Sequence, residues 1–114
     1  MSSNPLTTHV LDTSSGKPAA GLPVTLERET DSGFVPIGEG VTNDDGRLSN
    51  PLVQGEWSSG VYRITFDTAT YFASQQTRGF YPTVKVVFEV TEPDSHHHVP
   101  LLLSPFGYST YRGS

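Results

Sequence analysis

The sequence of 114 residues contains no cysteine. This absence excludes disulfide bonds, thiolate metal ligands and a cysteine nucleophile. Basic residues are also few: seven Lys and Arg stand against twelve Asp and Glu, which gives a formal net charge of -5. Nucleic acids and anionic membranes attract clustered basic side chains, so this acidic chain is expected to bind neither of them.

Targeting signals and membrane spans are equally hard to find in the sequence. The opening Met-Ser-Ser-Asn-Pro has neither the basic region nor the apolar stretch of a secretory signal, and no later run is long and apolar enough to span a bilayer. The closing Arg-Gly-Ser does not match the Ser-Lys-Leu address of peroxisomes. We therefore expect a soluble cytoplasmic protein, and a peroxisomal location by another route stays open.

Turn-forming residues are abundant. Eleven glycines and nine prolines separate short runs rich in Val, Ile, Leu, Thr and aromatic residues, a pattern typical of a mainly β protein. The length leaves room for a single domain over residues 1–114. Period-two alternation and turn signals predict eight strands, at residues 6–12, 22–30, 34–42, 47–48, 61–66, 83–90, 96–103 and 106–112. Eight short strands in a domain of this size favour a sandwich of two sheets.

One short helix is expected between the fifth and sixth of these strands. Asp67 or Thr68 can cap its start, and Gly79 is placed to end it. We expect two or three turns at most. Trp57 is expected to pack in or under a loop, whereas Arg28, Arg63 and Arg78 are expected to be solvated.

Three polar residues lie in separate predicted strands and suit hydrolytic chemistry. They are His9, Arg47 just beyond the turn at residues 43–46, and His98. A histidine titrates near neutral pH and can take a proton from water, while a positioned arginine can stabilise an oxyanion. The sequence has no Gly-x-Ser-x-Gly motif, which favours direct attack by water over an acyl-enzyme. We also expect the terminal residues 111–114 to be built into a site, because an Arg and a carboxylate directly follow a predicted strand.

Alternation divides the three consecutive histidines between two faces. His96 and His98 share one face, and His97 points to the other, at the margin of the core if that face is the buried one. Two imidazoles on one face, with His9 as a third ligand, could also hold zinc or copper. No Asp or Glu has an obvious spacing to complete such a set, so we expect no metal site.

Each of these residues also has a plain structural interpretation. Taken alone, a strand histidine such as His9 is usually a surface or structural residue. Arg47 follows an Asp-Asp-Gly turn and could pair with Asp44 or Asp45, a surface ion pair worth under about 1 kcal/mol.

Three segments resemble one known family. Residues 6–19 (LTTHVLDTSSGKPA), residues 98–110 (HVPLLLSPFGYST) and the terminal Tyr-Arg-Gly-Ser resemble the 5-hydroxyisourate hydrolases, the transthyretin-related enzymes of urate breakdown. The resemblance covers nearly the whole chain. It implies a transthyretin-like sandwich of two four-stranded sheets that assembles as a homotetramer, a dimer of dimers around a channel. It also implies that the first, fourth, seventh and eighth strands form the sheet that faces this channel.

The resemblance further implies the reaction and its residues. Water would open the ring of 5-hydroxyisourate at a carbonyl to give 2-oxo-4-hydroxy-4-carboxy-5-ureidoimidazoline, without a cofactor. His98 would act as the base, His9 would orient the water or share the proton, and Arg47 would hold the anionic or carbonyl edge of the substrate. The substrate-binding residues would be Tyr111, Arg112, Gly113 and Ser114. Of these, Arg112 and the Ser114 carboxylate would close the pocket and Tyr111 would shape the channel wall.

The main alternative is a transthyretin-like carrier that binds a small ligand in the same channel. A carrier would favour an apolar lining, whereas His9, Arg47 and His98 cost desolvation energy unless they serve something polar. An adhesive or structural sandwich would predict secretion or tandem domains, and neither is visible. Many relatives would have Tyr where this chain has His97, a departure on the strand face opposite to His98.

Overall fold

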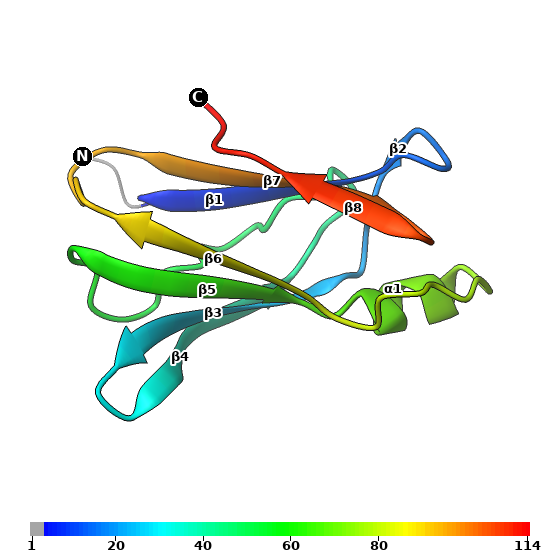
Figure 1. The fold of residues 1–114 in the computed structure, drawn as a ribbon. Coiled ribbons are helices and arrows are strands. Elements are labelled where there is room, and N and C mark those ends of the chain that lie inside the picture. Colours follow the sequence, from blue (N-terminus) through cyan, green and yellow to red (C-terminus); the bar gives the residue numbers. More distant parts are fainter. Residues whose placement is uncertain (1–3) are drawn as a thin grey trace.

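The computed structural model describes residues 4–114, and it has two sheets that lie face to face with one helix at their end (Figure 1). The first sheet has the order β2-β1-β7-β8 and the second β4-β3-β5-β6. The first contains β1 (Leu6–Asp12), β2 (Lys17–Pro18), β7 (His97–Ser104) and β8 (Gly107–Thr110). The second contains β3 (Pro23–Thr30), β4 (Gly33–Val41), β5 (Gly60–Phe66) and β6 (Val84–Val90). The predicted fold class, a mainly β sandwich of two four-stranded sheets with one short helix, is confirmed.

The predicted single domain includes Met1, Ser2 and Ser3, which lie outside the described residues. Within residues 4–114, no helix has the length and apolar character needed to cross a bilayer.

The first sheet brings the two ends of the sequence together. β1 and β7 pair in parallel, with Thr7 opposite His98 and His9 opposite Pro100. β7 then pairs antiparallel with β8, and an isolated bridge between His98 and Gly113 continues this pairing beyond the end of β8. Residues about ninety positions apart in the sequence therefore share one surface.

The strand predicted at residues 47–48 is wrong. The Asn43 side chain accepts hydrogen bonds from the backbone N–H of Asp45 (2.9 Å) and of Arg47 (3.2 Å), so the local turn uses this backbone. The turn docks on β1 through a single bond, from the Val10 N–H to the Gly46 carbonyl at 2.9 Å. The fourth strand of the first sheet is β2 instead, which pairs with the end of β1.

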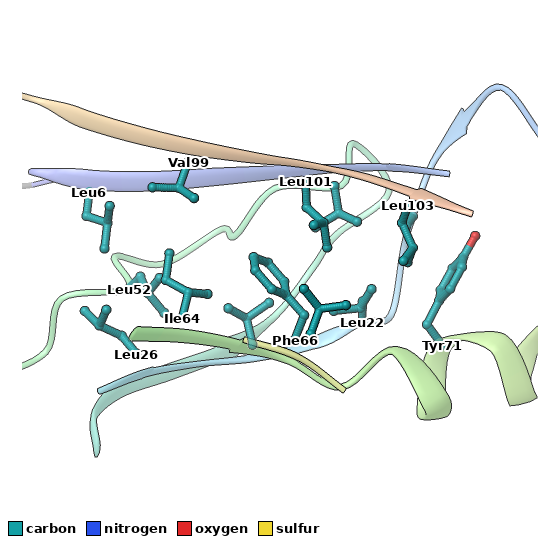
Figure 2. Packing of buried hydrophobic residues seen from close by; sticks show 14 of the residues in the cluster. Leu6, Leu22, Leu26, Leu52, Ile64, Phe66, Tyr71, Val99, Leu101 and Leu103 are labelled. Carbon is teal, nitrogen blue, oxygen red and sulfur yellow. The ribbon is translucent and has the colours of Figure 1, made fainter. Parts of the chain in front are cut away.

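The core fills the space between the two sheets (Figure 2). Val99, Leu101 and Leu103 of β7 face residues such as Ile64 and Phe66 of the second sheet. Each fully buried side chain of this size contributes roughly 1.5–3 kcal/mol. His97 shares their face and is only 6% exposed, as its predicted position at the margin of the core requires. His98 consequently points outward.

Two arginines that were expected to be solvated are held by side chains of the second sheet. Arg63 donates to the Glu27 carboxylate at 2.8 and 2.9 Å, and Arg28 donates to the hydroxyl of Tyr62. In each case the two partners lie directly opposite each other on β3 and β5. This pairing between strands cannot be derived from alternation within one strand. Trp57 packs against the core and donates to the Pro93 carbonyl at 3.0 Å, so its predicted packing is confirmed.

The helix α1 (Thr68–Ser74) begins as predicted and ends earlier. The Asp67 side chain accepts from the Thr70 N–H at 3.1 Å, which is the expected N-cap. The helix ends well before Gly79, because Gln76 takes the left-handed conformation (φ 55°) that a glycine was expected to supply.

A buried hydrogen bond connects α1 to the first sheet. The Tyr71 hydroxyl donates to the Asp12 carboxylate at 2.7 Å, and Ser14 donates to the same carboxylate through its hydroxyl (2.6 Å) and N–H (3.0 Å). Burial by itself raises the pKa of Asp12, but the hydrogen bonds from Ser14 and Tyr71 outweigh it and lower that pKa below its ordinary value.

This arrangement predicts a pH-dependent effect of Tyr71→Phe. A carboxyl group with a lowered folded-state pKa stabilises the fold above its unfolded pKa, and this stability is lost as pH falls through the folded-state pKa. Removing one donor should therefore lower the free energy of unfolding by about 1–2 kcal/mol at pH 7 and by less in acid. Urea unfolding at pH 7 and pH 3 measures the difference, with Tyr81→Phe as control because Tyr81 is 39% exposed. An equal loss at both pH values would contradict the role of the ionised Asp12.

Candidate active site

The candidate residues gather on the outer face of the first sheet. Along β1 buried and part-exposed residues alternate, so Thr7 and His9 point away from the core. On β7 the same alternation turns His98 outward beside Thr7. His9 and His98 therefore lie diagonally across two adjacent strands, on one face.

His98 is held from two sides. Its Nδ1 lies 2.7 Å from the Thr7 hydroxyl oxygen, and its ring stacks on that of His96 with centroids 6.4 Å apart. Its backbone carbonyl accepts from the Gly113 N–H at 2.8 Å. A Cβ on Gly113 would lie 2.5 Å from Cδ2 of His98, so glycine alone fits against this ring. The ring orientation is thus fixed by neighbours from β1, from His96 just before β7, and from the C-terminal segment.

The surroundings of the His98 ring favour its neutral form. Burial lowers the pKa of His98 below its ordinary value, and the charges of Arg47, His96 and His9 lower it further. A hydrogen bond to the Thr7 backbone acts in the opposite direction and is outweighed. A neutral, oriented imidazole is the form that can accept a proton from water.

Arg47 reaches this surface on the turn that crosses β1. Gly46 has φ 75°, and a Cβ there would lie 2.4 Å from the Val10 carbonyl oxygen and 3.3 Å from Cδ2 of His9. Because Gly46 approaches β1 closely, the turn lies against His9. Arg47 is exposed and comes close enough to His98 for its charge to lower the pKa of His98. Among residues 4–114 the ion pair between Arg63 and Glu27 stands alone, so Arg47 does not form the alternative pair with Asp44 or Asp45.

The C-terminal residues lie at one end of this surface. Tyr111 is 58% exposed, Arg112 and Ser114 are exposed, and Gly113 is half-buried against His98. Tyr111, Arg112 and His98 also line a cavity of about 220 Å³ between the edges of the two sheets. The remaining lining residues of this cavity are Val86, Phe88, Glu89, His97, Val99 and Thr110. His9 and Arg47 do not line this cavity. They lie near His98 on the outer face of the sheet instead.

Two residues near His98 received no role from sequence reasoning. Alternation along β1 puts Thr7 on the face of His9, and His96 was predicted on the face of His98, but the contact between Thr7 and these histidines depends on the parallel pairing of β1 with β7. Alternation within each strand was the one available signal. No group of three His, Cys, Asp or Glu suited to a metal ion occurs in the part of the chain that the structure describes.

The fold and this polar surface define a class before any comparison: a transthyretin-like sandwich whose outer sheet face carries histidines and an arginine. The sequence matches the HIUase/Transthyretin family over residues 6–113. It is 48% identical to the 5-hydroxyisourate hydrolase of Deinococcus radiodurans over the full length of both chains. The chain belongs to the HIUase/Transthyretin family, as the resemblance predicted.

Solved structures agree with this assignment. The 5-hydroxyisourate hydrolase of Klebsiella pneumoniae superposes with a TM-score of 0.84 at 35% identity, over 97% of this chain and 99% of that one. Sea bream transthyretin in complex with thyroxine superposes with a TM-score of 0.87 at 34% identity, over 96% of this chain and 94% of that one. The fold is therefore shared by a 5-hydroxyisourate hydrolase and a transthyretin that binds thyroxine, and the side chains of the site must separate catalysis from ligand binding.

Proposed function

We propose that this protein is a hydrolase that opens the ring of 5-hydroxyisourate to 2-oxo-4-hydroxy-4-carboxy-5-ureidoimidazoline in urate breakdown. The observation that carries the proposal is the convergence of an oriented His98 with His9 and Arg47 on one sheet face, in surroundings that lower the pKa of His98. The hydrolase names of relatives at up to 48% identity support the same activity. A carrier without catalysis is not favoured, because its ligand would meet these polar groups in place of an apolar wall.

His98 would act as the general base. Its free ring nitrogen would take a proton from water while the water oxygen attacks a ring carbonyl of the substrate. The tetrahedral intermediate would then expel the ring nitrogen, and the imidazolium would return its proton to that leaving nitrogen. The carboxylic acid formed in this step would lose its own proton to solvent and become the carboxylate. A general base of this kind contributes roughly 100- to 10,000-fold to the rate.

The other residues would position the substrate and stabilise charge. Arg47 carries a fixed positive charge near His98 and would hold the carbonyl oxygen as it becomes negative. His9, held under the Gly46 turn, would orient the water or share its proton. The substrate-binding residues would be Tyr111, Arg112, Gly113 and Ser114.

We also propose a single-domain cytoplasmic protein that assembles as a homotetramer, a dimer of dimers. Apolar side chains on β6, on β8 and beyond it support assembly, because Val87, Tyr108 and Tyr111 are 58%, 43% and 58% exposed. Light scattering should then give four times the mass of the 12.4-kDa chain. In such a tetramer the candidate face would line the channel where subunits meet. Full activity in a monomer would contradict this placement of the site.

The ultraviolet absorbance of 5-hydroxyisourate, made in place from urate by urate oxidase, tests Arg47 directly. We expect Arg47→Ala to lower kcat/KM by about 100-fold, because a donor to the developing oxyanion is lost. Arg78→Ala is the matched control, since Arg78 lies beside α1 and away from His98. Equal rates for the two variants would contradict the role proposed for Arg47.

A further inference from the structure

A single hydroxyl group lies between two imidazole rings beside the candidate base. The Thr7 hydroxyl oxygen lies 2.7 Å from Nδ1 of His98 and 3.1 Å from Nε2 of His96. The parallel register of β1 and β7 places Thr7 directly opposite His98, so the three side chains share one face. Thr7 and His96 are not among the residues proposed to touch the substrate.

The hydroxyl has one proton, and this limits the arrangements of the three groups. If Thr7 donates to His96, it accepts from His98, whose proton then lies on Nδ1 and whose Nε2 is free. If Thr7 donates to His98, the Nδ1 of His98 is an acceptor and its proton lies on Nε2. The first arrangement leaves His98 a base, and the second makes its outer nitrogen a donor.

The protonated state of the ring selects the first arrangement. When Nε2 takes a proton, both ring nitrogens of His98 are donors, so Thr7 must accept from Nδ1. In the first arrangement the Thr7 hydroxyl donates its hydrogen bond to His96 whether His98 is neutral or protonated. The hydrogen bonds between the three side chains therefore need not rearrange during the reaction.

We propose that Thr7 and His96 are positioning residues that keep His98 in the tautomer with its proton on Nδ1 and its Nε2 free. The consequence for catalysis rests on the proposed function; the tautomer itself does not. Without His96, the Thr7 hydroxyl loses its acceptor and turns toward Nδ1 of His98, 2.7 Å away. In a variant without the Thr7 hydroxyl, the hydrogen bond that holds the His98 proton on Nδ1 is lost.

The tautomer can be read without substrate from the ring nitrogens of ¹⁵N-histidine-labelled protein by NMR. At pH 8 the wild type should show His98, assigned by the loss of its signals in His98→Asn, with Nδ1 protonated and Nε2 not. His96→Ala and Thr7→Val should both raise the share of the Nε2–H tautomer, and Thr7→Ser, which keeps the hydroxyl, should not. A wild type with the proton on Nε2, or a tautomer unchanged in His96→Ala and Thr7→Val, would overturn the proposal.

Kinetics of 5-hydroxyisourate decay give the second readout. Thr7→Val and His96→Ala should each lower kcat by about tenfold, the value of one hydrogen bond, with little change in KM. Because both act through the same contact, the double variant should lose no more than either single variant. Thr7→Ser should restore most of the rate, and additive losses would overturn the proposal. The spectra decide the inference even for a wild type that does not hydrolyse 5-hydroxyisourate.

Discussion

Substituting Ala for Gly113 is expected to lower kcat/KM for 5-hydroxyisourate by about 100-fold, the cost of misplacing a catalytic group by about 1 Å. The added Cβ would lie 2.5 Å from Cδ2 and 3.2 Å from Cγ of His98, closer than real contacts allow. Thr7 holds the same ring from its other side, so either the ring or the C-terminal segment must move. Both movements disturb the site.

Stability should change little in this variant. Gly113 lies beyond the end of β8 and is only half-buried, so displacing it removes a bridge and no core packing. Gly107→Ala is the matched control, because a Cβ there meets its nearest atom, Oγ of Ser104, at an ordinary 3.8 Å. Steady-state kinetics and urea unfolding of both variants provide the test. Full activity in Gly113→Ala would show that this close approach does not position His98.

The second large effect is expected for His98→Asn. Asparagine keeps a polar side chain of similar shape and cannot take a proton from water, so kcat/KM should fall by roughly 100- to 10,000-fold. Circular dichroism should show an unchanged fold, since the side chain points away from the core. His97→Tyr introduces the residue that the resemblance places there in many relatives, on the opposite face, and should keep its activity.

The pH dependence of kcat/KM in the wild type and in His98→Asn gives a sharper test of the base. Burial, followed by the charges of Arg47, His96 and His9, lowers the pKa of His98, so its base form persists to a more acidic pH than that of an ordinary histidine. In the wild type, kcat/KM should therefore fall only as pH drops through this lowered pKa, and His98→Asn should lack that acid limb. An identical acid limb in both proteins would assign the base to another residue.

The sandwich could be predicted because its signals are local. Alternation gives the inward face of β7, on which Val99, Leu101 and Leu103 are buried, and capping chemistry gives the start of α1 at Asp67. The strand at residues 47–48 was wrong because the Asn43 side chain holds the following backbone in a turn, and a pattern of two residues cannot reveal this. The helix ends early in a turn in which the N–H groups of Gln76 and Thr77 donate to the carbonyls of Ala73 and Phe72, and Gln76 takes the left-handed position that glycine usually occupies.

The candidate site depended more on long-range pairing. The resemblance named His9, Arg47 and His98, and the structure brings them to one face, whereas their roles stay predictions. Thr7 and Gly46 could not be recognised, because the parallel pairing of β1 with β7 and the crossing of the turn over β1 have no counterpart in period-two patterns. A glycine that approaches a ring closely looks in the sequence like any other turn glycine.

The outer face of the first sheet, with His9, Arg47 and His98, is proposed to accelerate the opening of 5-hydroxyisourate. The most direct measurement is the ultraviolet decay of 5-hydroxyisourate, generated from urate by urate oxidase, at several concentrations of the wild-type protein shown to be folded and free of metal. We expect a decay rate that rises above the spontaneous rate in proportion to protein concentration. Decay at the spontaneous rate at every concentration would contradict it and would favour the small-ligand carrier.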